Sequence, residues 1–184
     1  MKIVETELDG VVVIEPDVFG DERGYFLETY NQDRYQEFGI KANFVQDNLS
    51  LSKKGILRGL HFQYPKAQAK LVQVIQGEVF DVVLDIRRES PTFGCWIGES
   101  LSDKNKRQIY LPEGVAHGFC VLSDTALFHY KCTNFYAPQY EGGVLWSDPD
   151  LAIDWPVDFP LVSEKDATFS CLKDIEEDRL PAYK

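Results

Sequence analysis

Hydrophobic and polar residues alternate through much of the chain between residues 69 and 132, as they do in β-strands with one buried face. Residues 70–87 are predicted to form two strands joined at Gln76-Gly77-Glu78. Turns at residues 91–94 and 103–106 separate further short strands. The apolar residues of the second strand share one face by the two-residue period: Phe80, Val82, Leu84 and Ile86. Many short strands between turns predict an all-β jelly-roll barrel or sandwich.

The segment ALFHYKCTNFY, which begins at residue 126, also alternates. Its even-numbered residues, Tyr130 among them, share the face of the apolar Phe128, so we expect the Tyr130 side chain to point inward. His129 then points outward, and we predict no function for it. Nearer the N-terminus, NQDRYQEFG predicts a short helix that Asn31 or Asp33 caps and Gly39 ends.

The C-terminal segment from residue 146 is rich in proline and acidic residues, which predicts mostly loop with one or two helical turns near residues 172–178. It carries Trp146, Trp155 and Phe159, whose apolar surface predicts that the segment packs onto the barrel. We expect one domain over residues 1–184. Its jelly-roll core would span about residues 40–135, with the N-terminal strands and the C-terminal tail packed on it.

Composition narrows the class of protein. A hydrophobic content of 44% with 13% aromatic residues is typical of a folded globular protein. No apolar run approaches the roughly 18 residues of a membrane helix, and MKIVETELDG has acids where a signal peptide is apolar. We therefore expect a cytoplasmic protein with no membrane contact. The four cysteines form no CxxC pair, so we expect buried, reduced thiols.

The net charge of −11 argues against nucleic-acid binding, which needs lysine and arginine to neutralise phosphates. It does not argue against an anionic small molecule. A few cations focused in one cleft can bind a phosphate while the outer surface stays acidic.

Candidate chemistry is concentrated in GILRGLHFQYPKAQAK, residues 55–70, which holds Arg58, His61 and Lys70 around an apolar run. A histidine, with an unperturbed pKa of about 6.5, suits a general base near neutral pH. The alternative is a strand histidine that makes a hydrogen bond in the core. In a regular strand Arg58 and His61 would face opposite ways, unless Gly59 introduces a bulge or twist.

Two motifs resemble the cupin barrels. PEGVAHGF, residues 112–119, is similar to the P-x-G-x-x-H of the second cupin motif, and GLHFQ lies where the first motif has H-x-H. Gln63 replaces the second histidine of that motif, and no glutamate follows at the metal-ligand spacing. Lys70 nearby would oppose a divalent cation. We therefore expect a cupin-like barrel with no metal and no cofactor.

Seven motifs in order extend the resemblance over nearly the whole chain. They are FGDERGYF, QDNLSLS, GILRGLHFQ, LPEGVAHGF, YKCTNFYAPQYEGG, W-x-DPDLAIDWP and SEKD. Together they resemble the dTDP-4-dehydrorhamnose 3,5-epimerase family of dTDP-L-rhamnose biosynthesis. The resemblance implies an isomerase that acts on dTDP-4-dehydro-6-deoxyglucose, whose 4-keto group acidifies the hydrogens on C3 and C5. It implies no metal and no redox cofactor.

The resemblance also implies catalytic roles. His61 matches the base, and Asp166 matches the carboxylate that orients it. Tyr130 matches the acid that reprotonates the opposite face, and Lys70 the cation that stabilises the enolate oxygen. Without the resemblance, the favoured interpretations are a loop acid for Asp166 and a core tyrosine for Tyr130, and the alternative for Lys70 is a solvated lysine at a strand edge.

The remaining matches are substrate contacts: Arg23, Glu28, Gln46, Asp47, Asn48, Arg58, His117, Glu141 and Lys165. The family's homodimers place the N-terminal strand region of one subunit at its neighbour's site, which would let Arg23 and Glu28 act in trans. Alternatives stay open. One is a single 3- or 5-epimerase or a 3,4-ketoisomerase on a related nucleotide sugar. Gln63 argues against a metal-dependent cupin oxygenase, and Tyr130 opposite a His–Asp pair argues against a non-catalytic sugar-binding module.

Overall fold

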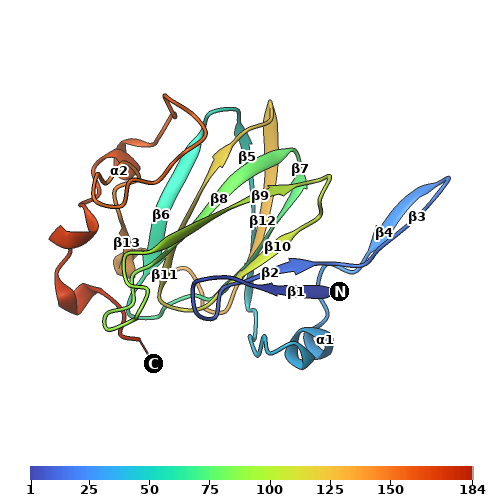
Figure 1. Cartoon of the computed structure of the whole chain (residues 1–184), viewed down its shortest axis with the longest axis horizontal. Helices are drawn as coiled ribbons and strands as arrows, with labels where there is room; N and C mark the ends of the chain where they lie inside the picture. The colour runs from blue at the N-terminus through green and yellow to red at the C-terminus, as the bar shows by residue number, and fades with distance from the viewer. Residues whose placement is uncertain (184) are drawn as a thin grey trace.

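The computed structural model describes residues 1–183, which form two antiparallel sheets that face each other (Figure 1). The larger sheet has the order β1 (Lys2–Glu5), β2 (Val12–Glu15), β10 (Gln108–Leu111), β7 (Lys70–Gln76), β12 (Thr125–Cys132) and β5 (Gln46–Lys53). The smaller sheet has the order β13 (Glu141–Gly143), β6 (Leu57–Gln63), β11 (Val115–Val121), β8 (Glu78–Asp85) and β9 (Trp96–Ser102). The predicted all-β jelly-roll class is confirmed. No helix in the described part of the chain is long and apolar enough to cross a membrane.

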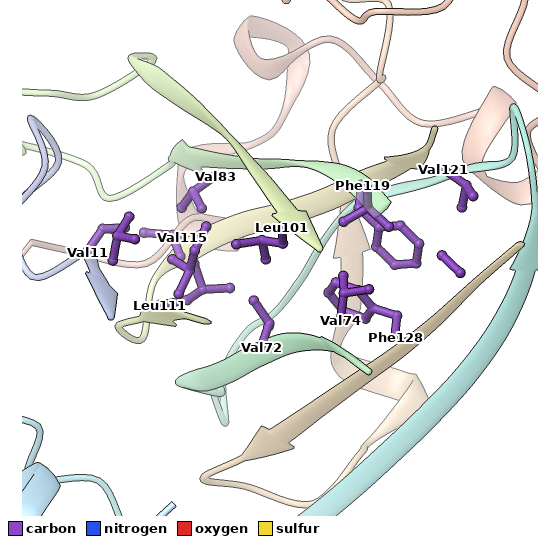
Figure 2. Packing of buried hydrophobic residues seen from close by; sticks show 14 of the residues in the cluster. Val11, Val72, Val74, Val83, Leu101, Leu111, Val115, Phe119, Val121 and Phe128 are labelled. Atoms are coloured by element: carbon purple, nitrogen blue, oxygen red, sulfur yellow. The ribbon is translucent and has the colours of Figure 1, made fainter. Parts of the chain in front are cut away.

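Apolar side chains from both sheets fill most of the space between them (Figure 2). Val72 of β7 and Phe128 of β12 come from the larger sheet, and Val83 of β8 and Phe119 of β11 from the smaller one. All four are at most 5% exposed. Each such side chain contributes about 1.5–3 kcal/mol when it is buried, so this cluster holds the two sheets together.

The C-terminal tail covers the outer face of the smaller sheet. Leu172 and Leu180 pack there against the even-numbered apolar residues of β8, as the predicted alternation requires. The tail forms α2 (Glu164–Ala167), which was not predicted, and the turns η2 (Leu172–Asp174) and η3 (Glu177–Arg179), which were. Trp155 packs onto the barrel as expected, but Phe159 is 96% exposed, so that part of the prediction is wrong. Residue 159 lies in a bend outside any helix or strand, where its side chain has no buried apolar surface to pack on.

The N-terminal region contributes to the barrel and also extends beyond it. Strands β1 and β2 join the larger sheet, and the predicted short helix is α1 (Gln32–Glu37), capped by the Asn31 side chain. Between them, β3 (Val18–Asp21) and β4 (Gly24–Leu27) form a hairpin that projects from the body (Figure 1). Its Phe19 and Phe26 are 65% and 69% exposed.

The cysteines follow the expectation only in part. Cys120 and Cys132 are buried, as predicted. Cys95 is exposed, because it follows a surface turn and precedes β9 at the edge of its sheet, and Cys171 is half-buried.

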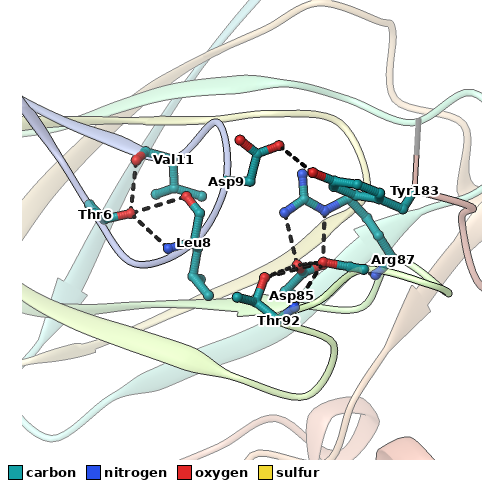
Figure 3. A network of polar contacts seen from close by, with 9 residues as sticks. Thr6, Leu8, Asp9, Val11, Asp85, Arg87, Thr92 and Tyr183 are labelled. Atoms are coloured by element: carbon teal, nitrogen blue, oxygen red, sulfur yellow. Dashed lines mark hydrogen bonds and ion pairs between the residues drawn. The ribbon is translucent and has the colours of Figure 1, made fainter.

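A buried ion pair at the end of β8 joins distant parts of the chain (Figure 3). The Asp85 carboxylate accepts hydrogen bonds from Nε and Nη2 of Arg87, each 2.8 Å long. The ring of Tyr183 lies over the Arg87 guanidinium, with its centre 5.2 Å away, and its hydroxyl donates to Asp9. One charged cluster therefore connects the N-terminal loop, β8 and the C-terminus.

Replacing Asp85 with alanine should lower the free energy of unfolding by about 3–5 kcal/mol, because Arg87 would stay buried without its partner. Chemical denaturation measures the change. As a control, Lys173→Ala removes an exposed ion pair with Asp150 and should leave stability almost unchanged. Equal stability losses in the two variants would contradict a structural role for the buried pair.

Candidate active site

Polar side chains replace apolar ones on the inner faces of both sheets at one end of the barrel. There they line a cavity of about 270 Å³. Alternation along the strands places them, since Asn48, Lys70 and Tyr130 occupy the same inward parity as the core residues of their own sheet. The lining residues are Gln46, Asn48, His61, Phe62, Gln63, Gln68, Lys70, Tyr130, Tyr136 and Glu141.

A bulge in β6 brings Arg58 and His61 to the same face. His61 pairs with His117 of β11, and Arg58 pairs with Phe119, so β6 has one residue more than β11 between the two pairs. Both residues therefore face inward, as the sequence allowed if Gly59 broke the strand. Gly59 has φ +121°, and a Cβ there would lie 2.5 Å from Cα of Gly118. Only glycine fits this position.

The Asp166 carboxylate holds His61. Oδ1 of Asp166, in α2, lies 2.7 Å from Nε2 of His61, and Oδ2 accepts a hydrogen bond of 3.2 Å from the Gly59 N–H. Burial acts to raise the pKa of Asp166, but the hydrogen bonds from His61, Gly59 and Ser163 outweigh it and lower that pKa. An ionised Asp166 accepts the Nε2 proton, which leaves Nδ1 as the basic nitrogen of His61.

Tyr130 and Lys70 reach the cavity from the opposite sheet. Nζ of Lys70 lies 5.8 Å from the centre of the Tyr130 ring. Burial raises the pKa of Tyr130, so its phenol keeps its proton at neutral pH. Burial lowers the pKa of Lys70, which is therefore not the solvated lysine of the alternative interpretation. His129 points outward as predicted, where its Nδ1 lies 3.1 Å from Nε2 of Gln73.

A loop held by Gln63 closes one side of the cavity. The Gln63 side chain donates to the Phe135 carbonyl and accepts from the Ala137 N–H. Tyr136 between them donates its hydroxyl to Glu141 at 2.7 Å, and Nζ of Lys165 lies 2.5 Å from the same carboxylate. The sequence pointed to Gln63 only as a missing metal ligand. Gln63 follows His61 by two residues in the same strand, so both side chains point to the inner face. This spacing was the sequence feature that could have placed Gln63 at the cavity.

A second, more open cleft of about 480 Å³ lies beside His61 and Asp166. Arg58 and Lys165 bring positive charge to it, and Ile56 and Leu161 bring apolar surface. Nε of Arg58 donates to the Ser52 hydroxyl at 3.0 Å, which holds the guanidinium at the mouth of the barrel. His61 thus stands between an inner cavity and a cationic outer cleft.

Three predicted substrate contacts line neither the cavity, nor the outer cleft, nor the small void beside His117 in their own chain. Asp47 lies on the outer face of β5 and pairs with Lys131 at 2.9 Å, because its parity is opposite to that of Gln46 and Asn48. Arg23 lies in the turn of the projecting hairpin, with its side chain 89% exposed, and pairs with Asp21. Glu28 pairs with Arg34 at 3.1 Å. As substrate contacts, these residues stay predictions.

His117 lies at the inner end of the site, where its Nε2 is 2.8 Å from Oδ2 of the fully buried Asp81. The sequence interpretation missed Asp81. Its signal was a carboxylate inside an apolar strand, on the face opposite Phe80 and Val82. Both cavity histidines are thus bonded to carboxylates. Within residues 1–183, no three His, Cys, Asp or Glu side chains form a group suited to a metal ion.

A histidine–carboxylate pair, a phenol on the opposite sheet and an ammonium group beside the phenol are suited to moving protons. Fold and site together define a cupin-like barrel whose cavity is suited to acid–base chemistry. The family model described as dTDP-4-dehydrorhamnose 3,5-epimerase matches residues 5–174. The chain belongs to this family, whose members are isomerases.

Individual relatives agree with this assignment. A dTDP-4-dehydrorhamnose 3,5-epimerase of Shigella flexneri is 58% identical over 168 residues, which cover 90% of this chain and 93% of that protein. A crystal structure of dTDP-6-deoxy-D-glucose-3,5-epimerase from Legionella pneumophila, in complex with dTDP-4-keto-L-rhamnose, superposes with a TM-score of 0.97 at 51% identity. That alignment covers 100% of this chain and 98% of the other. A dTDP-4-dehydrorhamnose 3-epimerase of Streptomyces niveus is 44% identical, covering 100% of this chain and 90% of that protein.

Asp166→Asn should release the tautomer of His61, because an amide does not bind the Nε2 proton as a carboxylate does. In the wild type, ¹⁵N NMR should show a protonated Nε2 and an unprotonated Nδ1 at pH 8. The variant should show a mixture of tautomers. The signals of His129, on the outer face of the barrel, are the internal control. An unchanged His61 spectrum would show that Asp166 does not orient the ring.

Proposed function

We propose that this protein inverts the C3 and C5 centres of dTDP-4-dehydro-6-deoxy-D-glucose and so forms dTDP-4-dehydro-L-rhamnose in dTDP-L-rhamnose biosynthesis. The placement of the His61–Asp166 pair and Tyr130 on opposite sheets of one cavity is the observation that carries the proposal. Epimerisation requires a base on one face of the sugar ring and an acid on the other. The names of the relatives supply the substrate.

Each inversion is a pair of proton transfers. Nδ1 of His61 takes the proton from C3 or C5, and the electrons of that C–H bond move onto the C4 carbonyl oxygen to form an enolate. The Lys70 ammonium stabilises the enolate oxygen. The Tyr130 phenol then donates its proton to the opposite face of the same carbon, and the C4 carbonyl forms again. Exchange with water returns a proton to Tyr130 and removes one from His61 before the next inversion.

The two cavities suit the two ends of a nucleotide sugar. The hexose would occupy the inner cavity, where Gln46, Asn48 and Glu141 offer hydrogen bonds. The diphosphate would lie in the outer cleft near Arg58 and Lys165, since guanidinium groups bind phosphate oxygens in pairs. This arrangement places the reacting carbons beside His61.

We further propose a homodimer in which Arg23 and Glu28 act at the partner's site. The projecting hairpin exposes Tyr25 and Phe26, which are 58% and 69% exposed, and Leu51 on the outer face of β5 is 67% exposed. Apolar surface of this extent is typical of an interface. The enzyme would act in the cytoplasm, whose reducing conditions suit the four free cysteines.

Incubation of the metal-stripped protein with the 4-keto substrate in D₂O should place deuterium at both C3 and C5, as read by NMR. His61→Ala should slow exchange at both carbons at least about 10²-fold, because the base is lost. Tyr130→Phe should impair product formation more than deuterium uptake, because proton abstraction survives. His129→Ala, which alters an outward-facing histidine, is the matched control.

The 44% identity to a 3-epimerase favours single epimerisation as the second candidate. It predicts deuterium at C3 alone. Uptake at neither carbon would overturn the enzyme assignment for this substrate, and near-normal turnover of His61→Ala would overturn the assignment of the base.

Mixing the inactive variants Arg23→Ala and His61→Ala tests the action of Arg23 in trans. After subunit exchange, each heterodimer would join the intact His61 of one chain to the intact Arg23 of the other. Random exchange should then restore about a quarter of wild-type turnover. If Arg23 serves its own chain, no intact site forms and the mixture stays inactive.

A further inference from the structure

The barrel contains a second histidine–carboxylate pair that the proton transfers above do not use. Nε2 of His117 on β11 lies 2.8 Å from Oδ2 of Asp81 on β8. His117 is 7% exposed and Asp81 is 0% exposed. Unlike His61, this pair has little access to a substrate, so its function must be exerted through neighbouring groups.

One oxygen of Asp81 has no partner. Oδ1 is buried and accepts no hydrogen bond from any residue of the described chain. A buried carboxylate oxygen without a donor costs free energy. Orientation of His117 needs only one acceptor oxygen, which a neutral amide would also supply, so it does not by itself explain a buried carboxylate at this position.

Lys70 is the cation that this oxygen can serve. Lys70 and His117 line the same small void at the inner end of the cavity, and the charges of Asp81 and Lys70 act on each other. Of the two carboxylates whose charges act on Lys70, Glu141 is already paired with Lys165 and Tyr136. The other ionisable groups around Lys70 are Tyr130 and Cys132 on β12, His117 on β11 and His61 on β6.

We propose that Asp81 is a positioning residue of the active site, which orients His117 through Oδ2 and holds Lys70 as an ammonium through the negative charge of its carboxylate. The inference rests on the proposed function, in which an ammonium stabilises the enolate oxygen. Burial raises the pKa of Asp81 and lowers that of Lys70, so their shared proton has two possible positions. The pair is either an ammonium with a carboxylate or a neutral amine with a carboxylic acid, and the total charge of the two forms is the same. Only the ammonium–carboxylate form stabilises an oxyanion.

NMR on protein labelled with ¹⁵N-lysine tests the proton position without substrate. The Nζ signal of Lys70, assigned with Lys70→Arg, should be that of an ammonium from pH 6 to 8. In Asp81→Asn the same group should lose its proton at a pH lower by at least about one unit, a tenfold loss of proton affinity. A neutral Lys70 in the wild type at pH 7, or an unshifted titration in the variant, would overturn the proposal.

Turnover gives a second readout. Asp81→Asn should lower kcat at least about tenfold with little change in KM. The alkaline limb of its pH profile should move to lower pH, because Lys70 loses its proton earlier. Asp85→Asn is the matched control, since it neutralises another fully buried carboxylate of β8 that is bonded to Arg87 instead. Asp85→Asn should lower stability without shifting the Lys70 titration or the pH profile of turnover. If both variants changed these two readouts equally, Asp81 would have only a structural role.

The epimerase assignment and the role of Asp81 can be overturned independently of each other. Absence of deuterium uptake by the wild type would overturn the epimerase assignment and leave the Lys70 titration valid. If Asp81→Asn does not fold, the wild-type titration still decides the proton position. A neutral amine in an active epimerase would overturn the role of Asp81 alone.

Discussion

The bulge at Gly59 is the constraint on which the site depends. A regular β6 would turn either Arg58 or His61 out of the barrel, whereas the extra residue turns both inward. The same distortion directs the Gly59 N–H at Asp166, so one backbone position both aims the base and holds its carboxylate. The close approach to Gly118 leaves no room for a side chain. Backbone geometry therefore fixes Arg58 and His61 relative to each other.

The site gathers positive charge although the protein as a whole is acidic. The chain has a net charge of −11, yet Arg58, Lys70 and Lys165 converge on two adjoining cavities. Arg58 and Lys165 are exposed and contact Ser52 and Glu141, whereas Lys70 is half-buried and the charge of Asp81 limits the cost of its burial. An acidic surface and a cationic site are compatible, because low-dielectric walls keep the field of a few cations local.

Local patterns predicted the strands and the direction of their side chains. The two-residue period placed Tyr130 inside and His129 outside correctly, and Asn31 caps the helix as its sequence indicated. Features that depend on distant segments were not predictable in this way. The exposure of Phe159 depends on the path of the tail, and the partner of Asp81 depends on how β8 lies beside β11. The outward direction of Asp47 was available from parity alone, but the motif resemblance grouped it with its inward-facing neighbours.

The two histidine–carboxylate pairs are alike in residue type but differ in exposure, which suits them to different chemistry. Asp166 comes from the tail, and its histidine keeps 31% of its side chain exposed with one ring nitrogen free to take a proton. Asp81 comes from a neighbouring core strand, and its histidine is almost enclosed. A base must reach both substrate and solvent to be reset after each inversion, which the enclosed pair does not do. In the proposed role its carboxylate acts instead through fixed charge, which is strongest where water is excluded. The difference in exposure therefore supports the two proposals, in which the pair at the mouth moves protons and the pair in the interior holds the charge of Lys70.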